Sequence, residues 1–217
     1  MERRFAHHNL FATFVNAVSP SDPIVPFYAG KFFTSASHMV HIPCFISHLH
    51  ALTAFTMSGA DRGVICEDDV LFHNDFMSKF SDVIDNAGST PLITLCAMIT
   101  EWVDYRYTGV DPSKLNLVTI DRNHTWGAHC YVVTRDYALH ALSLYNRPFD
   151  RHGTEITAEI IVRASGGVLA HPYLVIEDMI DSDRAPHELS YHRKHFECWG
   201  IENYSSSEIT ATLFRRT

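Results

Sequence analysis

The chain has 217 residues, of which 46% are hydrophobic and 19% charged, so it predicts one α/β domain with a buried core. The formal net charge of −8 argues against nucleic acid as a partner, because clustered lysines and arginines bind phosphate backbones. No stretch of about 18 or more uncharged apolar residues occurs, so no membrane span is expected.

The N-terminal residues 1–8 lack the apolar core of a signal peptide, and the five cysteines are widely spaced without a C-x-x-C pair. Four cysteines lie in apolar surroundings and are expected to be buried free thiols: Cys44, Cys66, Cys96 and Cys130. These features predict an intracellular, cytoplasmic protein. The glycine patterns of P-loop, dinucleotide-binding and serine-hydrolase sites do not occur in the sequence.

Hydrophobic spacing and the placing of Gly and Pro predict strands that alternate with helices. In chain order the pattern predicts a strand at 11–18, a helix at 44–52, a strand at 64–66, a helix at 75–87 with Asp75 as its N-cap, strands at 91–99, 117–120 and 129–133, helices at 135–145 and 154–164, and a strand at 168–176. This alternation favours a mixed, mainly parallel sheet with helices on both faces.

The most informative motif is the acidic triplet Glu67, Asp68 and Asp69, which follows the predicted strand at 64–66. Ligands bind at the C-terminal ends of strands in open α/β sheets. Three adjacent carboxylates repel one another, and a divalent cation relieves that repulsion. The triplet therefore indicates a metal site, although a solvated acidic loop has the same composition.

The residues upstream of the triplet strengthen the metal interpretation. Cys44-x-x-Ser47-His48 lies on the predicted helix at 44–52, whose Phe45, Leu49 and Leu52 share one face. The order C-x-x-S-H, helix, short turn, apolar strand, E-D-D resembles glycosyltransferase family 25, the group of lipooligosaccharide and collagen galactosyltransferases. The resemblance covers roughly positions 40–180. It implies a single GT-A-like domain over residues 1–217. The short chain is also similar in length to the small glycosyltransferases of large algal viruses, for which the location would be the host cytoplasm.

The resemblance implies a metal-dependent transfer of a sugar from a nucleotide-diphospho-sugar, most simply UDP-linked, to a hydroxyl of a glycan or glycoprotein acceptor. Asp69, the last acid, would coordinate Mn²⁺ or Mg²⁺. Asp68 would be a second ligand or a sugar contact, unless it caps the following turn. Glu67 would hold ribose or sugar hydroxyls or a metal-bound water. The family's first strand carries an Asn that helps to hold the nucleotide, and the segment at 11–18 with Asn16 either stands in for that strand or matches the second.

Many GT-A enzymes take a further metal ligand from their C-terminal segment. Here the candidates are Asp181, Asp183, His187 and His192, and His187 is preferred. His187 and His192 are five residues apart, about 140° around a helix, so they do not share a face as the zinc motif H-E-x-x-H requires. Each of these histidines could instead be an ordinary surface residue.

An inverting transfer needs a carboxylate base near the acceptor. Asp150, in a segment similar to the family's P-x-D element, is the first candidate and Glu155 the second, although Asp150 could equally cap a helix. Trp126 and Gly127 could form an acceptor platform, since an indole face suits a sugar ring, or could simply pack in the core. His48, with Ser47, is expected to orient the helix against the acidic strand rather than to act in catalysis.

Two other functions remain open from the sequence. A metal-dependent phosphoester hydrolase would need several His and Asp side chains to converge on two metals. A catalytically silent nucleotide-sugar-binding domain would keep the acids and lack a working base.

Overall fold

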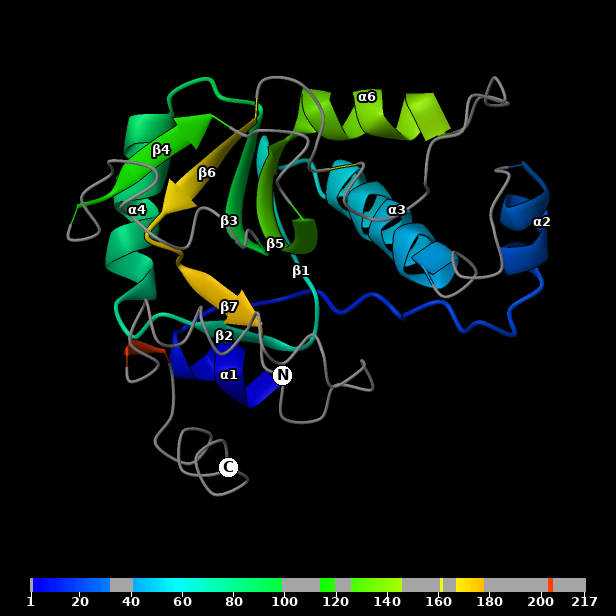
Figure 1. The fold of residues 1–217 in the computed structure, drawn as a ribbon, viewed down its shortest axis with the longest axis horizontal. Helices are drawn as coiled ribbons and strands as arrows, with labels where there is room; N and C mark the ends of the chain where they lie inside the picture. The colour runs from blue at the N-terminus through cyan, green and yellow to red at the C-terminus, as the bar shows by residue number, and fades with distance from the viewer. Residues whose placement is uncertain are drawn as a thin grey trace.

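The computed structural model describes residues 2–31, 41–98, 114–119, 126–145, 161, 167–177 and 203–204. Figure 1 labels the elements. They are α1 (Glu2–His7), α2 (Ile24–Lys31), α3 (His41–Met57), β1 (Arg62–Cys66), β2 (Val70–Phe72), α4 (Phe76–Ala87), β3 (Leu92–Met98), β4 (Asn116–Thr119), β5 (Trp126–Thr134), α6 (Arg135–Tyr145), β6 (Gly167–His171) and β7 (Val175–Glu177).

Five strands form the main sheet in the order β1-β5-β3-β6-β4, and β2 pairs with β7 in a second, two-stranded sheet. The sheet is mixed, as predicted, but its pairing differs from the mainly parallel expectation. Among the described strands of this sheet, only β3 and β6 pair in parallel, whereas β1–β5, β3–β5 and β4–β6 are antiparallel. Two of these antiparallel pairs arise because β5 lies between β1 and β3 and runs against both. Alternation of strands and helices along the chain does not reveal such an insertion.

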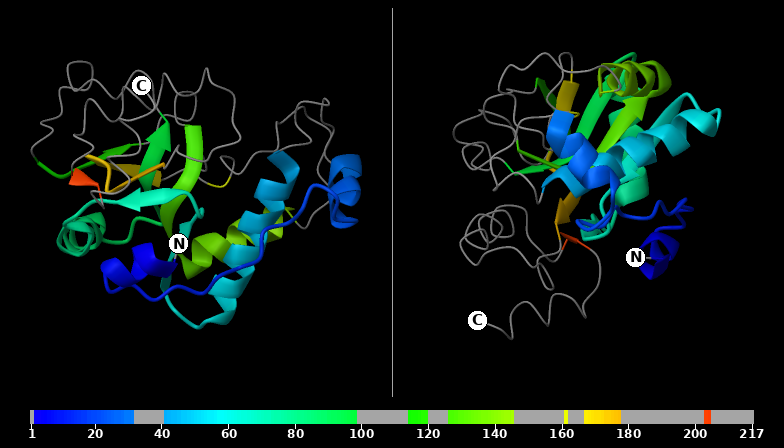
Figure 2. Two further views of the ribbon diagram at one scale, coloured as in Figure 1. Left: turned by 90° about the horizontal axis from the view of Figure 1, so that it is seen from below. Right: turned by 90° about the vertical axis from the view of Figure 1, so that its right-hand side faces the viewer.

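Helices cover both faces of the main sheet, as predicted. Successive side chains of a strand point to opposite faces of the sheet, so β5 contributes to the core on each face. Tyr131 and Val133 pack into a core with residues of α3 and α6. Cys130 and Val132 pack into a second core with residues of α4. Helices α3 and α6 also pack against each other (Figure 2).

Most predicted elements form within one to three residues of their expected ends. The face of α3 that carries Phe45, Leu49 and Leu52 is buried, as its spacing predicts. Helix α4 buries its apolar stripe in the same way. Asp75 precedes α4 as expected, but its side chain makes no capping hydrogen bond.

The strand predicted at 11–18 is absent from the described sheets, and this prediction is wrong. Its segment crosses from α1 to α2 with Phe11 fully exposed. The ring of Phe14 stacks edge-to-face on Phe5 rather than entering a core. Val18 donates its backbone N–H to Ser47 Oγ of α3 at 2.9 Å. The alternating apolar residues of 11–18 therefore belong to a connecting segment and do not pair with a strand of the described sheets.

The strand predicted at 168–176 is instead two strands, β6 and β7, in different sheets. Pro172 lies between them. Because proline has no N–H to donate, it cannot continue a ladder, and the chain leaves the main sheet at this point. The helix predicted at 154–164 lies outside the described residues except for Ile161, which is helical and buried.

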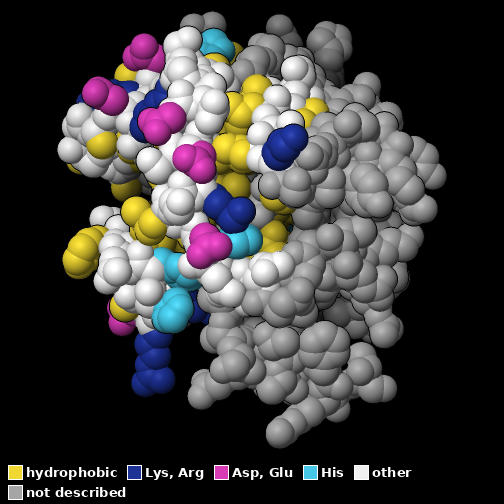
Figure 3. Space-filling model, turned by 90° about the vertical axis from the view of Figure 1, so that its left-hand side faces the viewer, with side chains coloured by type: hydrophobic (Ala, Val, Ile, Leu, Met, Phe, Trp, Pro, Cys, Tyr) yellow, Lys and Arg dark blue, Asp and Glu magenta, His cyan; other side chains and the backbone are white. Residues whose placement is uncertain are grey.

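Helix α1 attaches the N-terminus to the small sheet. Arg4 Nη1 donates to the backbone oxygen of Val70 at 3.1 Å, and Phe5 packs edge-to-face on Phe72. On the face that carries α4 and β4, described acidic and basic side chains are intermixed, and histidines gather low on that face (Figure 3). None of the described helices is long and apolar enough to cross a membrane.

Candidate active site

Helix α3 can approach β1 closely because Gly63 has no side chain. A Cβ atom on Gly63 would come within 2.5 Å of the Phe55 ring. This contact brings α3 alongside the strand whose end carries the acids. The chain then turns at Asp68 and Asp69 before entering β2. The site is thus framed by α3, the end of β1 and the facing strand β5.

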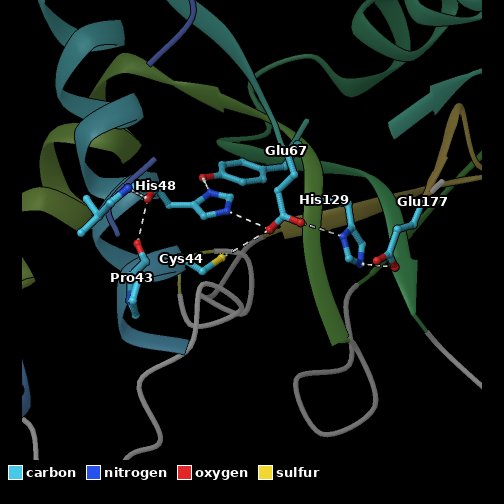
Figure 4. Close-up of polar contacts among 9 residues, drawn as sticks. Pro43, Cys44, His48, Glu67, His129 and Glu177 are labelled. Atoms are coloured by element: carbon cyan, nitrogen blue, oxygen red, sulfur yellow. Dashed lines mark hydrogen bonds and ion pairs between the residues drawn. The ribbon is translucent and has the colours of Figure 1, made fainter. Parts of the chain in front are cut away.

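Glu67 lies between two histidines from different elements (Figure 4). Its Oε1 is 3.1 Å from Nε2 of His48 on α3, and its Oε2 is 3.0 Å from Nδ1 of His129 on β5. The backbone N–H of Glu67 also donates to the backbone oxygen of His129 at 2.8 Å. The first acid of the triplet is therefore held on both carboxylate oxygens and at its backbone.

The contacts continue at both ends of this arrangement. His48 Nδ1 is 2.9 Å from the Tyr131 hydroxyl, and His129 Nε2 is 3.4 Å from Glu177 Oε2 on β7. The side chains of His129 and Glu177 are each only 1% exposed. Five polar side chains, from α3, β5, β7 and the residue that follows β1, thus form one largely buried series at the acidic turn.

The surroundings set the charge of this series. Burial by itself would raise the pKa of Glu67, but the hydrogen bonds and charges of His129 and His48 outweigh burial and hold that pKa well below its usual value. Burial raises the pKa of the Tyr131 hydroxyl well above its usual value, and the nearby Glu67 adds to the effect. Glu67 is therefore a carboxylate at neutral pH, and Tyr131 is a neutral phenol.

Asp69 completes a set of possible metal ligands. One ligand atom each from Glu67, Asp69 and His129 lie within 4.8 Å of one another. Two carboxylates and an imidazole suit a divalent cation, and the imidazole favours Mn²⁺ over Mg²⁺. This donor set therefore fits the cation that the sequence predicts. On the other side of Glu67, Cys44 donates its S–H to Oε1 at 3.6 Å.

Of the other predicted site residues, some lie in the described part of the chain and the remainder lie outside it. Asp68 is exposed in the turn beside Asp69, whereas Asn16 is exposed in the segment between α1 and α2, outside the sheet. Trp126 begins β5 opposite Met98, and Gly127 follows with a positive φ of 87° at an irregular part of the β3–β5 pairing. The remaining candidates lie outside the described residues: Asp150, Glu155, Asp181, Asp183, His187 and His192.

Sequence reasoning did not find three residues of the buried series: His129, Tyr131 and Glu177. Each lies at the edge of, or within, an apolar run and so resembles a core position. The one signal was an ionisable residue inside a predicted strand or directly after it, since such residues are rarely buried without a partner. His48 was expected only to orient α3, and its contact with Glu67 agrees with that expectation.

Comparison with known families gives a match over residues 1–150 to the model of glycosyltransferase family 25, described as LPS biosynthesis protein. The chain belongs to glycosyltransferase family 25. The matched region contains α3, the acidic triplet and β5, and therefore both histidines that contact Glu67. No curated protein matches the chain. Membership of family 25 implies a transferase that uses a nucleotide-sugar donor and a glycan acceptor.

Proposed function

We propose that this family 25 protein transfers a sugar from a UDP-linked donor to a hydroxyl of a glycan or glycoprotein, with Mn²⁺ or Mg²⁺ bound at the acidic turn. The observation that carries the proposal is the convergence of Asp69, Glu67 and His129 at the end of β1. These residues lie in the region that matches the family.

The divalent cation would supply the positive charge that a leaving diphosphate needs. The chain has a net charge of −8, so lysines and arginines are a poor source of that charge. Asp69 and His129 would hold the cation together with Glu67, while the exposed Asp68 would contact the donor sugar or serve as another ligand. Asn16 remains the proposed nucleotide contact and His187 the proposed additional ligand.

At the acceptor, a carboxylate would take the proton from the attacking hydroxyl as the new glycosidic bond forms. Asp150 is the proposed base and Glu155 the alternative. Trp126 and Gly127, at the start of β5, would form the acceptor platform. Because Trp126 and His129 belong to the same strand, an acceptor on this platform would lie near the acidic turn.

The proposal is tested by calorimetric titration of UDP, GDP and CMP into the protein, with and without Mn²⁺. UDP alone should bind, and only with Mn²⁺. Asp69→Asn should lose this binding, whereas Asp61→Asn, at the opposite, exposed end of β1, should retain it. Absence of nucleotide binding under every condition would overturn the proposed donor site.

The structure gives some support to the alternative of a phosphoester hydrolase, because two histidines do converge on Glu67. Family membership favours transfer. Release of phosphate from a generic phosphomonoester, in the absence of any nucleotide sugar, would favour hydrolysis. Metal-dependent UDP binding without transfer to any acceptor would instead indicate a silent binding domain.

A further inference from the structure

We propose that Cys44, His48 and Glu67 Oε1 form a second metal site, specific for Zn²⁺ and separate from the Mn²⁺ or Mg²⁺ site at Asp69. The inference does not depend on the proposed glycosyl transfer, since it concerns binding of the ion itself. The two sites would lie on opposite sides of Glu67, one at each carboxylate oxygen.

Helix geometry brings the first two ligands together. Cys44 and His48 are four residues apart on α3, and this spacing places side chains on the same helix face. Both face the end of β1, where Cys44 Sγ is 3.6 Å and His48 Nε2 is 3.1 Å from Glu67 Oε1 (Figure 4). One ligand atom from each of the three residues lies within 4.8 Å of the other two.

These separations are close to what zinc requires. With Zn–S near 2.3 Å and Zn–N and Zn–O near 2.0–2.2 Å, a tetrahedral ion holds its ligand atoms about 3.3–3.6 Å apart. The S–O distance of 3.6 Å already fits, and the N–O distance of 3.1 Å needs to open only slightly. The fourth position would be open to water, as in zinc sites that have three protein ligands.

The ligand chemistry separates this set from the one at Asp69. A thiolate with an imidazole and a carboxylate suits Zn²⁺, whereas Mg²⁺ and Mn²⁺ prefer oxygen-rich sets. Zn²⁺ would replace the thiol proton of Cys44, which would pass to solvent, and would bind Nε2 of a neutral His48 whose ring proton lies on Nδ1. No electrons are transferred in this exchange.

Outer contacts of the kind found around metal sites are already in place. His48 Nδ1 bonds to the Tyr131 hydroxyl at 2.9 Å, which leaves Nε2 to face the ion. Glu67 Oε2 bonds to His129 Nδ1 at 3.0 Å, which orients the carboxylate. Such partners fix the direction of the ligand atoms before the ion arrives.

The test uses the full chain, freed of metal, titrated with Co²⁺ as a spectroscopic probe and then with Zn²⁺. Wild type should show the absorption of tetrahedral Co²⁺ with a thiolate-to-metal band in the near ultraviolet, and Zn²⁺ should displace it. Cys44→Ser should lose the thiolate band, and His48→Asn should bind Zn²⁺ at least about tenfold more weakly. The exposed His50→Asn on the same helix should match wild type. Co²⁺ binding without a thiolate band would overturn the proposal.

A second measurement needs no variant. Zn²⁺ should protect Cys44 from alkylation in wild type, as read by peptide mass spectrometry, whereas Mg²⁺ should not. Equal alkylation with and without Zn²⁺ would also overturn the proposal. Asp69→Asn should keep the Zn²⁺ protection while losing Mn²⁺-dependent UDP binding, so failure of one site is distinguishable from failure of the other.

Discussion

Glu67 and His129 contact each other twice, through the backbone and through the side chains. The N–H of Glu67 donates to the carbonyl oxygen of His129 at 2.8 Å, and its Oε2 lies 3.0 Å from His129 Nδ1. The ladder between β1 and β5 thus ends where the side-chain contact begins. The position of the first acid is therefore set by the pairing of two strands and not by the acidic turn alone.

This double contact predicts strong coupling between the two side chains. Glu67→Gln and His129→Asn should each lower the free energy of unfolding, and the double variant should lose less than the sum of the two, with a coupling of about 0.5–3 kcal/mol. Urea denaturation of wild type, the two single variants and the double variant, in the presence of a chelator, measures this double-mutant cycle. Glu67→Gln combined with the exposed His50→Asn should be additive, and additivity of the main pair would contradict a direct interaction.

The close approach of α3 to β1 predicts that Gly63→Ala destabilises the protein. The new methyl group would meet the Phe55 ring at 2.5 Å, so overpacking should cost about 1–3 kcal/mol in the free energy of unfolding. Adding Phe55→Leu should recover part of this loss. Gly88→Ala is a control, because its Cβ meets open space and its cost, about 1–3 kcal/mol, comes from a backbone conformation (φ 53°, ψ −120°) that favours glycine. Phe55→Leu should not rescue that control.

Burial of His171 predicts acid sensitivity. Burial lowers its pKa from the ordinary 6.5. As the pH falls below 6.5, the unfolded chain binds a proton that the folded chain takes up only at lower pH, so the free energy of unfolding decreases. His171→Gln should flatten this decrease between pH 7.5 and 5, as measured by urea denaturation. Some slope should remain, since the pKa values of His8 and His73 are lowered too. An unchanged slope would be contrary to this expectation.

Cys66 and Cys130 are predicted to form a disulfide under a thiol oxidant. They form a directly opposed, non-hydrogen-bonded pair of the antiparallel strands β1 and β5, and their sulfur atoms are 2.8 Å apart. Diamide should take two electrons and two protons from the pair, and peptide mapping should find the link. Burial raises the pKa of the Cys130 thiol well above its usual value, so the reaction should be slow at pH 7 and faster at higher pH. Retention of both free thiols after prolonged oxidation would refute the prediction.

The local part of the architecture could be predicted from the sequence, because it depends on spacing. Helices α3, α4 and α6 and strands β1 and β3 follow from apolar periodicity, and the acids follow from their place after β1. The order of strands could not be predicted, since it depends on which surfaces meet. The break at Pro172 was missed, although a proline inside a predicted strand signals that the ladder ends there.

The candidate site divides in the same way. Asp69 and Glu67 were identified because three acids in a row are unusual after a strand. His129 was missed because its partner is 62 residues earlier in the chain and the two meet only when β5 pairs with β1. Glu177 was missed for a similar reason, since it belongs to a strand of the second sheet.

Ser47 and His48 are neighbours in the sequence but serve different attachments. Consecutive helix residues point about 100° apart. Ser47 Oγ accepts from the Val18 N–H and donates to the Pro43 carbonyl oxygen, whereas His48 contacts Glu67 and Tyr131. In an alignment of family 25, the serine should therefore covary with the N-terminal connection, and the histidine with the first acid. Homologues whose chain reaches α3 by another route are free to replace the serine and still keep the histidine.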